Sequence, residues 1–136
     1  MIVIVTGPPC SGKSTYITDN AKDGDIIIDM DRLALALTVE GASPFEYGEK
    51  IRKVARAARG AAVKEALKVA QGERYLGVWI IHTDPTPDAR MAYRAAGARI
   101  VEMETPKQVC LERLKLRPKQ NQLIARSVID EYFSTR

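Results

Sequence analysis

Nine consecutive residues near the start of the chain constrain its fold more than any other part of the sequence. Residues 7–15 read GPPCSGKST and satisfy the pattern G-x-x-x-x-G-K-[ST]. This pattern predicts a loop that wraps its backbone N–H groups around a phosphate, and a side chain at Gly7 or Gly12 would obstruct that approach. The pattern is meaningful only between a strand and a helix, so the neighbouring residues test it.

The flanking residues supply both elements. Ile2 to Val5 form a short β-branched run, typical of a strand buried on both faces of a parallel sheet. A helix is expected to begin near Gly12. A chance Gly-rich turn would not need this context, so the sequence predicts the P-loop class of nucleotide-binding fold.

Residues of the loop have expected partners on a nucleotide such as ATP. Lys13 should reach the β- and γ-phosphates, and the Ser14 hydroxyl should bind Mg²⁺. Thr15 can donate to the α-phosphate, where the dipole of the following helix adds positive charge. A redox role for the Cys10 thiol is conceivable, but a small filler residue is the simpler interpretation. The predicted nucleotide contacts are Gly7, Pro8, Pro9, Cys10, Ser11, Gly12, Lys13, Ser14 and Thr15.

The rest of the chain alternates between apolar β-branched runs and helical periodicity. We expect strands over 25–29, 78–82 and 100–103. Helices are expected over 46–70 with a break near Gly60, over 88–96 with Gly97 as C-terminal cap, over 106–116 and over 121–133. This alternation predicts an α/β fold of three layers, with helices on both faces of a parallel sheet of four to five strands.

Length and composition limit what this fold can be. The 136 residues suit a single domain, 1–136, and 46% of them are hydrophobic, which allows a packed core. Two cysteines and one histidine exclude a disulfide scaffold and a zinc site of ordinary spacing. Because we find neither a basic leader nor an apolar run of membrane-spanning length, we expect a cytoplasmic protein without membrane contact. The oligomeric state stays open.

Four stretches together resemble the small P-loop kinases, and among these the kinase domains of bacteriophage polynucleotide kinases. They are GPPCSGKST at 7–15, IDMDR at 28–32, WIIHTDPTPDAR at 79–90 and ERLKLRPKQ at 112–120. The resemblance follows nearly the whole chain in the order of its elements, and the phosphate loop is its specific part. It implies ATP-dependent phosphoryl transfer, with Mg²⁺, to a hydroxyl of a nucleic-acid or nucleoside-type acceptor.

The resemblance implies that Asp31 is the general base, because these kinases place an Asp just after the second strand. Asp29 is the alternative, since a carboxylate at this edge of the sheet faces the γ-phosphate across the crevice. Either residue could instead cap a helix before Leu33. We place Asp29 and Arg32 beside the acceptor, but Ala34 and Leu35 stand where the resemblance implies an arginine for an acceptor phosphate. That departure leaves the acceptor open.

The segment IIIDMDRL at 26–33 is also similar to the opening motif of haloacid-dehalogenase-like phosphatases. Asp29 would then be a nucleophile and Asp31 an acid. That motif normally lies on the first strand of its domain, and it needs a later Lys and an acidic pair that we cannot place. We therefore prefer the kinase interpretation.

Basic residues between the last two expected helices predict a lid over ATP, approximately 113–126. Arg113 and Arg117 are expected to share one helical face, at i and i+4. Arg117 resembles the lid arginine that stabilises charge on the transferred phosphoryl group. We assign Arg113 to nucleotide binding and Arg126 to the acceptor. A solvated helix face is the alternative for each.

The end of the third strand offers further candidates. Asp84 lies where this class often places a Mg²⁺-water ligand or an acceptor contact, although it could simply cap the turn before Pro85. His82 is interpreted as a strand-end residue rather than a base. The sequence does not decide which of His82, Thr83 and Asp84 faces the metal.

Arg52, Arg56 and Arg59 line one side of the long expected helix. Together with a net charge of +4, this stripe could hold a polynucleotide backbone, with Arg52 as its candidate substrate contact. A solvated helix face is the commoner explanation. The reason is that Tyr47 is the only aromatic ring close to the stripe, whereas single-strand binders interleave several.

Two other functions share these motifs. A nucleoside monophosphate or small-metabolite kinase would differ only in its acceptor. A non-kinase NTPase or nucleotide-binding module is disfavoured because the third strand ends at His82-Thr83-Asp84, with no adjacent Glu to activate water. The sequence does not distinguish ATP from GTP.

Overall fold

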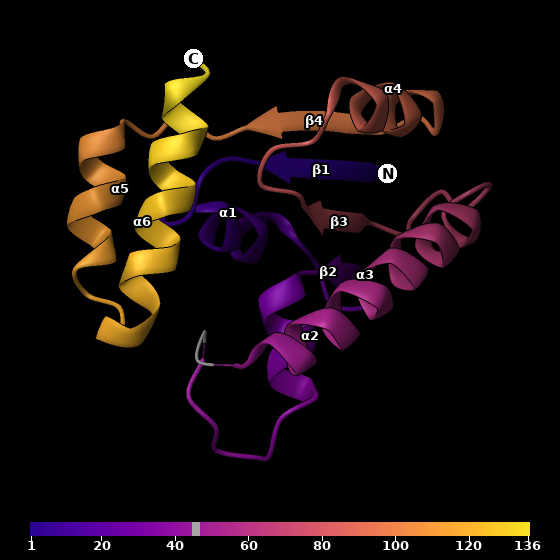
Figure 1. Ribbon diagram of the computed structural model, residues 1–136. Coiled ribbons are helices and arrows are strands. Elements are labelled where there is room, and N and C mark those ends of the chain that lie inside the picture. Colours follow the sequence, from indigo (N-terminus) through magenta and orange to yellow (C-terminus); the bar gives the residue numbers. More distant parts are fainter. Residues whose placement is uncertain (45–46) are drawn as a thin grey trace.

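A parallel sheet of four strands organises the part of the chain that the computed structural model describes, residues 1–44 and 47–136 apart from the side chains of 120 and 121 (Figure 1). The strand order is β2-β3-β1-β4, with the bounds β1 (Ile2–Thr6), β2 (Ile26–Ile28), β3 (Val78–Ile81) and β4 (Arg99–Glu102). Each strand begins and ends within one residue of its expected limits. Helices pack on both faces, so the predicted three-layer α/β fold is confirmed.

Six helices accompany these strands in the described residues. Their bounds are α1 (Lys13–Asn20), α2 (Met30–Ala36), α3 (Glu49–Val69), α4 (Pro87–Ala95), α5 (Lys107–Leu114) and α6 (Lys119–Ser134). In Figure 1, α5 and α6 stand side by side beyond the carboxyl ends of β1 and β4. None of the helices in the described ranges is both long and apolar enough to cross a membrane.

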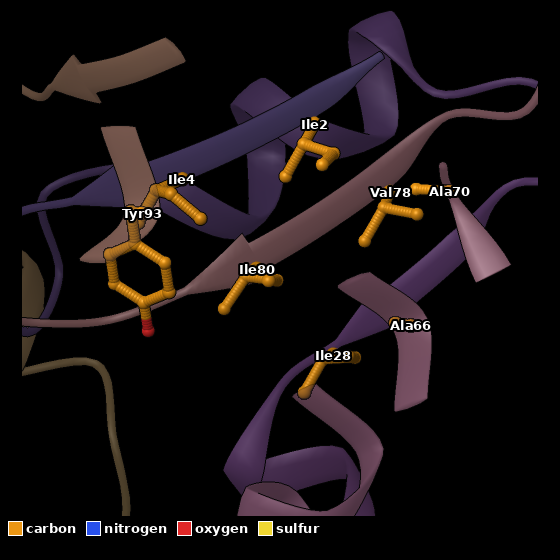
Figure 2. Packing of buried hydrophobic residues seen from close by; sticks show 8 residues of the cluster. All are labelled: Ile2, Ile4, Ile28, Ala66, Ala70, Val78, Ile80 and Tyr93. Carbon is orange, nitrogen blue, oxygen red and sulfur yellow. The ribbon is translucent and has the colours of Figure 1, made fainter. Parts of the chain in front are cut away.

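The central strand, β1, is buried on both faces because alternate side chains pack against different helices. One face meets α3 and α4, and its cluster comprises Ile2, Ile4, Ile28, Ala66, Ala70, Val78, Ile80 and Tyr93 (Figure 2). The other face meets α1, and its cluster comprises Val3, Val5, Ile17 and Trp79. The apolar run near the start of the chain therefore forms the middle of the core.

The long helix α3 runs without interruption through Gly60, so the expected break is wrong. Gly60 lies on an exposed part of the helix with nothing within 4 Å of a Cβ position. A single glycine costs a helix about 1 kcal/mol relative to alanine, and the alanine-rich sequence around it offsets that cost. The helix begins at Glu49; the expected start at 46 lies outside the described residues.

A short helix, α2, follows β2 directly, as the alternative role of Asp29 or Asp31 as a helix cap implied. Asp29 is its N-cap, and its side chain accepts a hydrogen bond of 3.0 Å from the backbone N–H of Asp31. Asp31 lies in the first turn of the same helix. Of the two acidic residues, Asp29 is therefore the helix cap.

The helix α5 ends at Leu114, earlier than expected. Arg117 lies in the connection to α6, so the expectation that Arg113 and Arg117 share a helical face is wrong. Pro118 precedes the first residue of α6 and fixes the start of that helix. The predicted cap at Gly97 is confirmed, because this residue follows the end of α4 with φ +86°.

The strand order determines where a ligand can bind. The chain leaves β1 through α1 toward β2, whereas it leaves β3 through α4 toward β4, on the other side of β1. Because β1 and β3 are parallel neighbours, a crevice opens between their carboxyl ends at this reversal. The phosphate loop follows β1 and therefore lies at this crevice.

One acidic side chain ties the turn before β2 to the start of β3. Asp25 accepts hydrogen bonds from the backbone N–H of Lys22 at 2.9 Å, from the backbone N–H of Gly77 at 3.0 Å and from Trp79 Nε1 at 3.0 Å. These bonds lower the pKa of Asp25 below its usual value, the bond from Lys22 most. A Cβ at Gly77 would lie 2.6 Å from the Asp25 carboxylate, so this close approach requires glycine.

We expect Asp25→Ala to lower the free energy of unfolding by about 1–3 kcal/mol, because it removes one charged acceptor from three donors. Urea denaturation followed by circular dichroism measures this change. Asp23→Ala, in the same turn but exposed, is the matched control and should change stability little. Equal stability of the two variants would contradict the structural role given to Asp25.

Candidate active site

The loop between β1 and α1 needs glycine at both glycine positions of its pattern. Gly7 and Gly12 have φ values of +148° and +96°, which L side chains rarely adopt. A Cβ at Gly7 would also lie 2.6 Å from Ser11 Oγ and 3.0 Å from the Met103 side chain. The backbone can therefore take this path only if residues 7 and 12 carry no side chain.

Lys13 closes the loop from the first turn of α1. Its ammonium group donates hydrogen bonds to the carbonyls of Gly7 and Pro8, at 2.6 and 2.7 Å. The N-cap of α1, Gly12, supplies no side-chain hydrogen bond to the helix. Backbone N–H groups of the first turn are thus available to an anion, where the helix dipole favours negative charge.

Neighbouring elements support the loop through its backbone. The N–H of Gly7 donates to the carbonyl of Thr83 at 3.0 Å. The Thr105 hydroxyl donates to the carbonyl of Ser11 at 2.7 Å, and Arg113 donates from Nη1 to the carbonyl of Cys10 at 3.1 Å. Arg113 therefore holds the loop from α5. Sequence reasoning missed Thr105, since no local pattern links it to a loop 94 positions earlier.

The loop opens into a cavity of about 1410 Å³. This volume exceeds the few hundred to roughly 1,000 Å³ typical of small-molecule sites. Among the predicted site residues, those that line the cavity are Pro9, Cys10, Ser11, Gly12, Lys13, Ser14, Thr15, Asp29, Asp31, Arg32, Arg52, Asp84, Arg113 and Arg117. Arg126 is exposed on α6 and does not line the cavity.

Two carboxylates, Asp29 and Asp31, line the cavity after β2. Burial and the neighbouring charge of Asp31 raise the pKa of Asp29 above its usual value. The Tyr47 hydroxyl donates to Asp31 Oδ1 at 2.5 Å, and burial together with this bond raises the pKa of Tyr47. Tyr47 thus remains protonated and orients the Asp31 carboxylate.

The charges of the cavity act on one another. Burial first, and then the positive charge of Arg117, lower the pKa of Lys13 to about 8, while Asp29 and Asp31 oppose the shift. Arg117 is half-buried and contributes to the same cavity wall. Arg117, Lys13 and both carboxylates are therefore close enough to interact electrostatically, and an anion near Lys13 and Arg117 would relieve their repulsion.

At the end of β3, Asp84 forms ion pairs with two arginines. Its Oδ1 lies 3.1 Å from Arg136 Nη2 and 3.8 Å from Arg90 Nη2. Both guanidinium groups compete with any metal ion for this carboxylate. His82 forms a hydrogen bond of 2.9 Å between Nδ1 and the Tyr93 hydroxyl. Burial first, then the charges of Arg59 and Arg90, lower the pKa of His82 to about 4.

The arginine stripe of α3 borders the cavity. Arg52, Arg56 and Arg59 all line it; Arg52 and Arg59 are half-buried, and Arg56 is exposed. Arg59 donates from Nη2 to the carbonyl of Ile81 at 2.9 Å, and the Arg52 guanidinium lies 5.5 Å from the centre of the Tyr47 ring. The helical spacing was visible in the sequence, but the direction of this face was not.

The phosphate loop lies at the carboxyl end of a parallel sheet and requires glycine at two positions. Its lysine and two carboxylates line one cavity. This combination defines a P-loop nucleotide-binding protein. The chain belongs to the family described as AAA domain, whose model matches residues 2–135. No curated protein matches the chain.

Two solved structures are similar in fold. Shikimate kinase from Acinetobacter baumannii, in complex with shikimate, is 20% identical with a TM-score of 0.54, over 95% of this chain and 74% of that chain. Deoxyadenosine kinase from M. mycoides with bound dATP is 13% identical with a TM-score of 0.46, over 99% and 85%. The match to shikimate kinase shows a shared α/β fold.

We expect Gly7→Ala to abolish nucleotide binding, because the added Cβ meets Ser11 and Met103 and distorts the phosphate loop. Titration with a fluorescent ATP analogue measures this loss. Gly60→Ala is the matched control on the exposed side of α3; it should bind normally and be more stable by up to about 1 kcal/mol. Normal binding by Gly7→Ala would contradict the loop geometry.

The low pKa of His82 predicts a pH dependence of stability. Between pH 4 and 6.5 the unfolded chain binds a proton at this position that the folded protein excludes. The free energy of unfolding should therefore fall as the pH drops through this window. His82→Gln should flatten the profile of urea midpoints against pH there. An unchanged slope would show that His82 does not carry this dependence.

Proposed function

We propose that this protein is an ATP-dependent kinase that transfers the γ-phosphoryl group to a hydroxyl. The observation that carries the proposal is the shared cavity of the phosphate loop and the Asp29–Asp31 pair. These elements follow β1 and β2, with the end of β3 between them. A carboxylate on the cavity that holds the phosphates is what in-line transfer to a hydroxyl requires.

Lys13, Arg117 and the loop amides would hold the phosphates of ATP. A triphosphate between Lys13 and Arg117 separates two cations that repel each other, and charge developing on the γ-phosphoryl group strengthens both contacts. Arg113 acts indirectly, through the carbonyl of Cys10 that it holds.

The donor set around Ser14 suits Mg²⁺, which prefers oxygen ligands and keeps several waters and phosphate oxygens. Ser14 is exposed to the cavity in the first turn of α1, next to Lys13. Bound there, the cation would neutralise charge on the β- and γ-phosphates. Asp84 is already paired with Arg90 and Arg136, so we propose Ser14 and not Asp84 as the protein ligand.

Asp31 would act as the general base. Its carboxylate takes the proton of the acceptor hydroxyl while the acceptor oxygen bonds to the γ-phosphorus and the bond to the β–γ bridging oxygen breaks, releasing ADP. The Tyr47 hydroxyl keeps Asp31 oriented. Asp29 is fixed as the cap of α2 and supports this position through the N–H of Asp31.

The acceptor that we propose is a nucleoside-type hydroxyl, in keeping with the resemblance of the motifs to polynucleotide kinases. A small metabolite is the second candidate, because shikimate kinase, which has a similar fold, binds shikimate in its complex. Neither choice follows from fold similarity, which is shared by kinases of different acceptors.

We expect Asp31→Asn to lower kcat by about 10²–10⁴-fold, the usual effect of losing a general base, while the Kd for ATP stays unchanged. Steady-state kinetics on the best acceptor and a nucleotide titration separate these effects. Asp29→Asn is the matched control, because asparagine caps helices as well as aspartate, and it should retain most activity. If Asp29→Asn is the inactive variant, the roles of the two residues are reversed.

Lys13→Ala should weaken ATP binding and reduce transfer by at least about 10²-fold, because it removes the charge that clamps the phosphates and the two hydrogen bonds that close the loop. Lys22→Ala, exposed after α1, is the control for lost positive charge. Full activity of Lys13→Ala would contradict the kinase assignment.

A further inference from the structure

The three arginines of α3 form a cationic wall of the cavity. They occupy positions i, i+4 and i+7 on one helical face. Ion pairs within the described residues involve other groups, and none joins a carboxylate to Arg52, Arg56 or Arg59. Like charges at i and i+4 destabilise a helix, so this arrangement is unfavourable until an anion lies against it.

The wall is held in place at both ends. Arg59 is fixed by the carbonyl of Ile81 at the end of β3. Arg52 stacks on Tyr47, whose hydroxyl binds Asp31. Arg52 is thus connected through one side chain to the proposed general base. An anion bound here would lie beside the carboxylate that receives the acceptor proton.

Two of the arginines retain capacity to bind. Arg52 Nε is buried and has no hydrogen-bond partner in the described part of the chain, which is costly for a charged donor. Arg56 is exposed to the cavity, and its guanidinium makes no hydrogen bond to described residues. Guanidinium groups bind phosphate and carboxylate oxygens in pairs of parallel hydrogen bonds.

We propose that Arg52 and Arg56 bind an oxyanion carried by a small acceptor, a phosphate monoester or a carboxylate, while the acceptor's hydroxyl lies at Asp31. The proposal rests on the kinase function proposed above and names its substrate class. It also accounts for Ala34: the side chain at that position of α2 is fully buried in the fold. The arginines of α3 therefore add to the charge of Arg32, the basic residue of α2 that lines the cavity.

A binding experiment tests the wall without requiring turnover. The protein is saturated with Mg²⁺ and the non-hydrolysable ATP analogue AMP-PNP, so that the loop is filled, and inorganic phosphate is then added. The Nε–Hε signals of the arginines are followed by ¹H–¹⁵N NMR and assigned through Arg52→Gln and Arg56→Gln. We expect saturable shifts of both signals, and an apparent Kd about tenfold or more higher in either variant.

Lys53→Gln is the matched control, because Lys53 is an exposed neighbour on α3 that does not line the cavity. It removes the same charge and should leave the Kd for phosphate within about twofold, since exposed charges interact weakly. Absence of saturable shifts, or equal weakening by Lys53→Gln, would overturn the proposal. Arg56→Gln, at an exposed position, keeps the test valid if Arg52→Gln does not fold.

Kinetic measurements then distinguish a phosphate from a carboxylate on the acceptor. They also distinguish failure of this proposal from failure of the proposed kinase function. Adenosine 3′-monophosphate is compared with adenosine, and shikimate with its methyl ester. We expect the charged member of one pair to have the lower KM, and Arg56→Gln to remove that difference without changing KM for ATP. Equal KM values within both pairs, or equal use of a 5′-hydroxyl oligonucleotide with steep salt dependence, would overturn a small anionic acceptor while leaving the kinase function standing. Phosphate binding without any transfer would instead overturn the kinase function while leaving the anion site of Arg52 and Arg56 standing.

Discussion

The hydrogen bonds from Lys13 to the carbonyls of Gly7 and Pro8 fix the geometry on which the site depends. They draw the loop into a ring that only glycine can complete at Gly7 and Gly12. They also hold a buried ammonium group close to Arg117, which is why the pKa of Lys13 falls to about 8. The repulsion between these two cations would be relieved by a bound polyphosphate. The loop therefore favours anions whether or not it takes part in catalysis.

The parallel sheet places the anion-binding loop and the carboxylates on opposite sides of one site. Because all four strands are parallel, the residues that follow them meet at one edge. The loop follows β1, the Asp29–Asp31 pair follows β2, and Ile81 and His82 lie at the end of β3 between them. The helix α3 then brings its arginines to the same cavity. In the proposed function, phosphates, acceptor hydroxyl and acceptor anion would in this way be held by different elements of one fold.

Local patterns allowed the sequence to predict the loop, the four strands and most helices. The motif is contiguous, and the β-branched runs are short and bounded by turns. The sequence indicated the helix α2 only through the alternative role of Asp29 or Asp31 as a cap, because the seven residues that form it are too few for a clear periodic pattern. The break at Gly60 was wrong because propensity is outweighed by packing of neighbouring turns, including the buried Ala55 and Ala66.

The parts of the site that the sequence could not predict all depend on tertiary contacts. Helical spacing grouped Arg52, Arg56 and Arg59, but only the packing of α3 on the sheet determines that this face meets the cavity. Likewise, the distance along the chain hides the contact of Thr105 with Ser11. Arg117 was assigned to a helix that ends three residues earlier, and its charge instead acts on Lys13 from the connection to α6.

The central claim is that this cavity transfers phosphate to an acceptor rather than to water. The direct measurement follows the label of [γ-³²P]ATP with Mg²⁺ in the presence of nucleosides, nucleoside monophosphates, shikimate, oligonucleotides with a 5′-hydroxyl, or no acceptor. The account predicts label on a hydroxyl compound, well above the rate of inorganic phosphate release. Release of phosphate at the same rate with and without every acceptor would contradict it and would identify an NTPase.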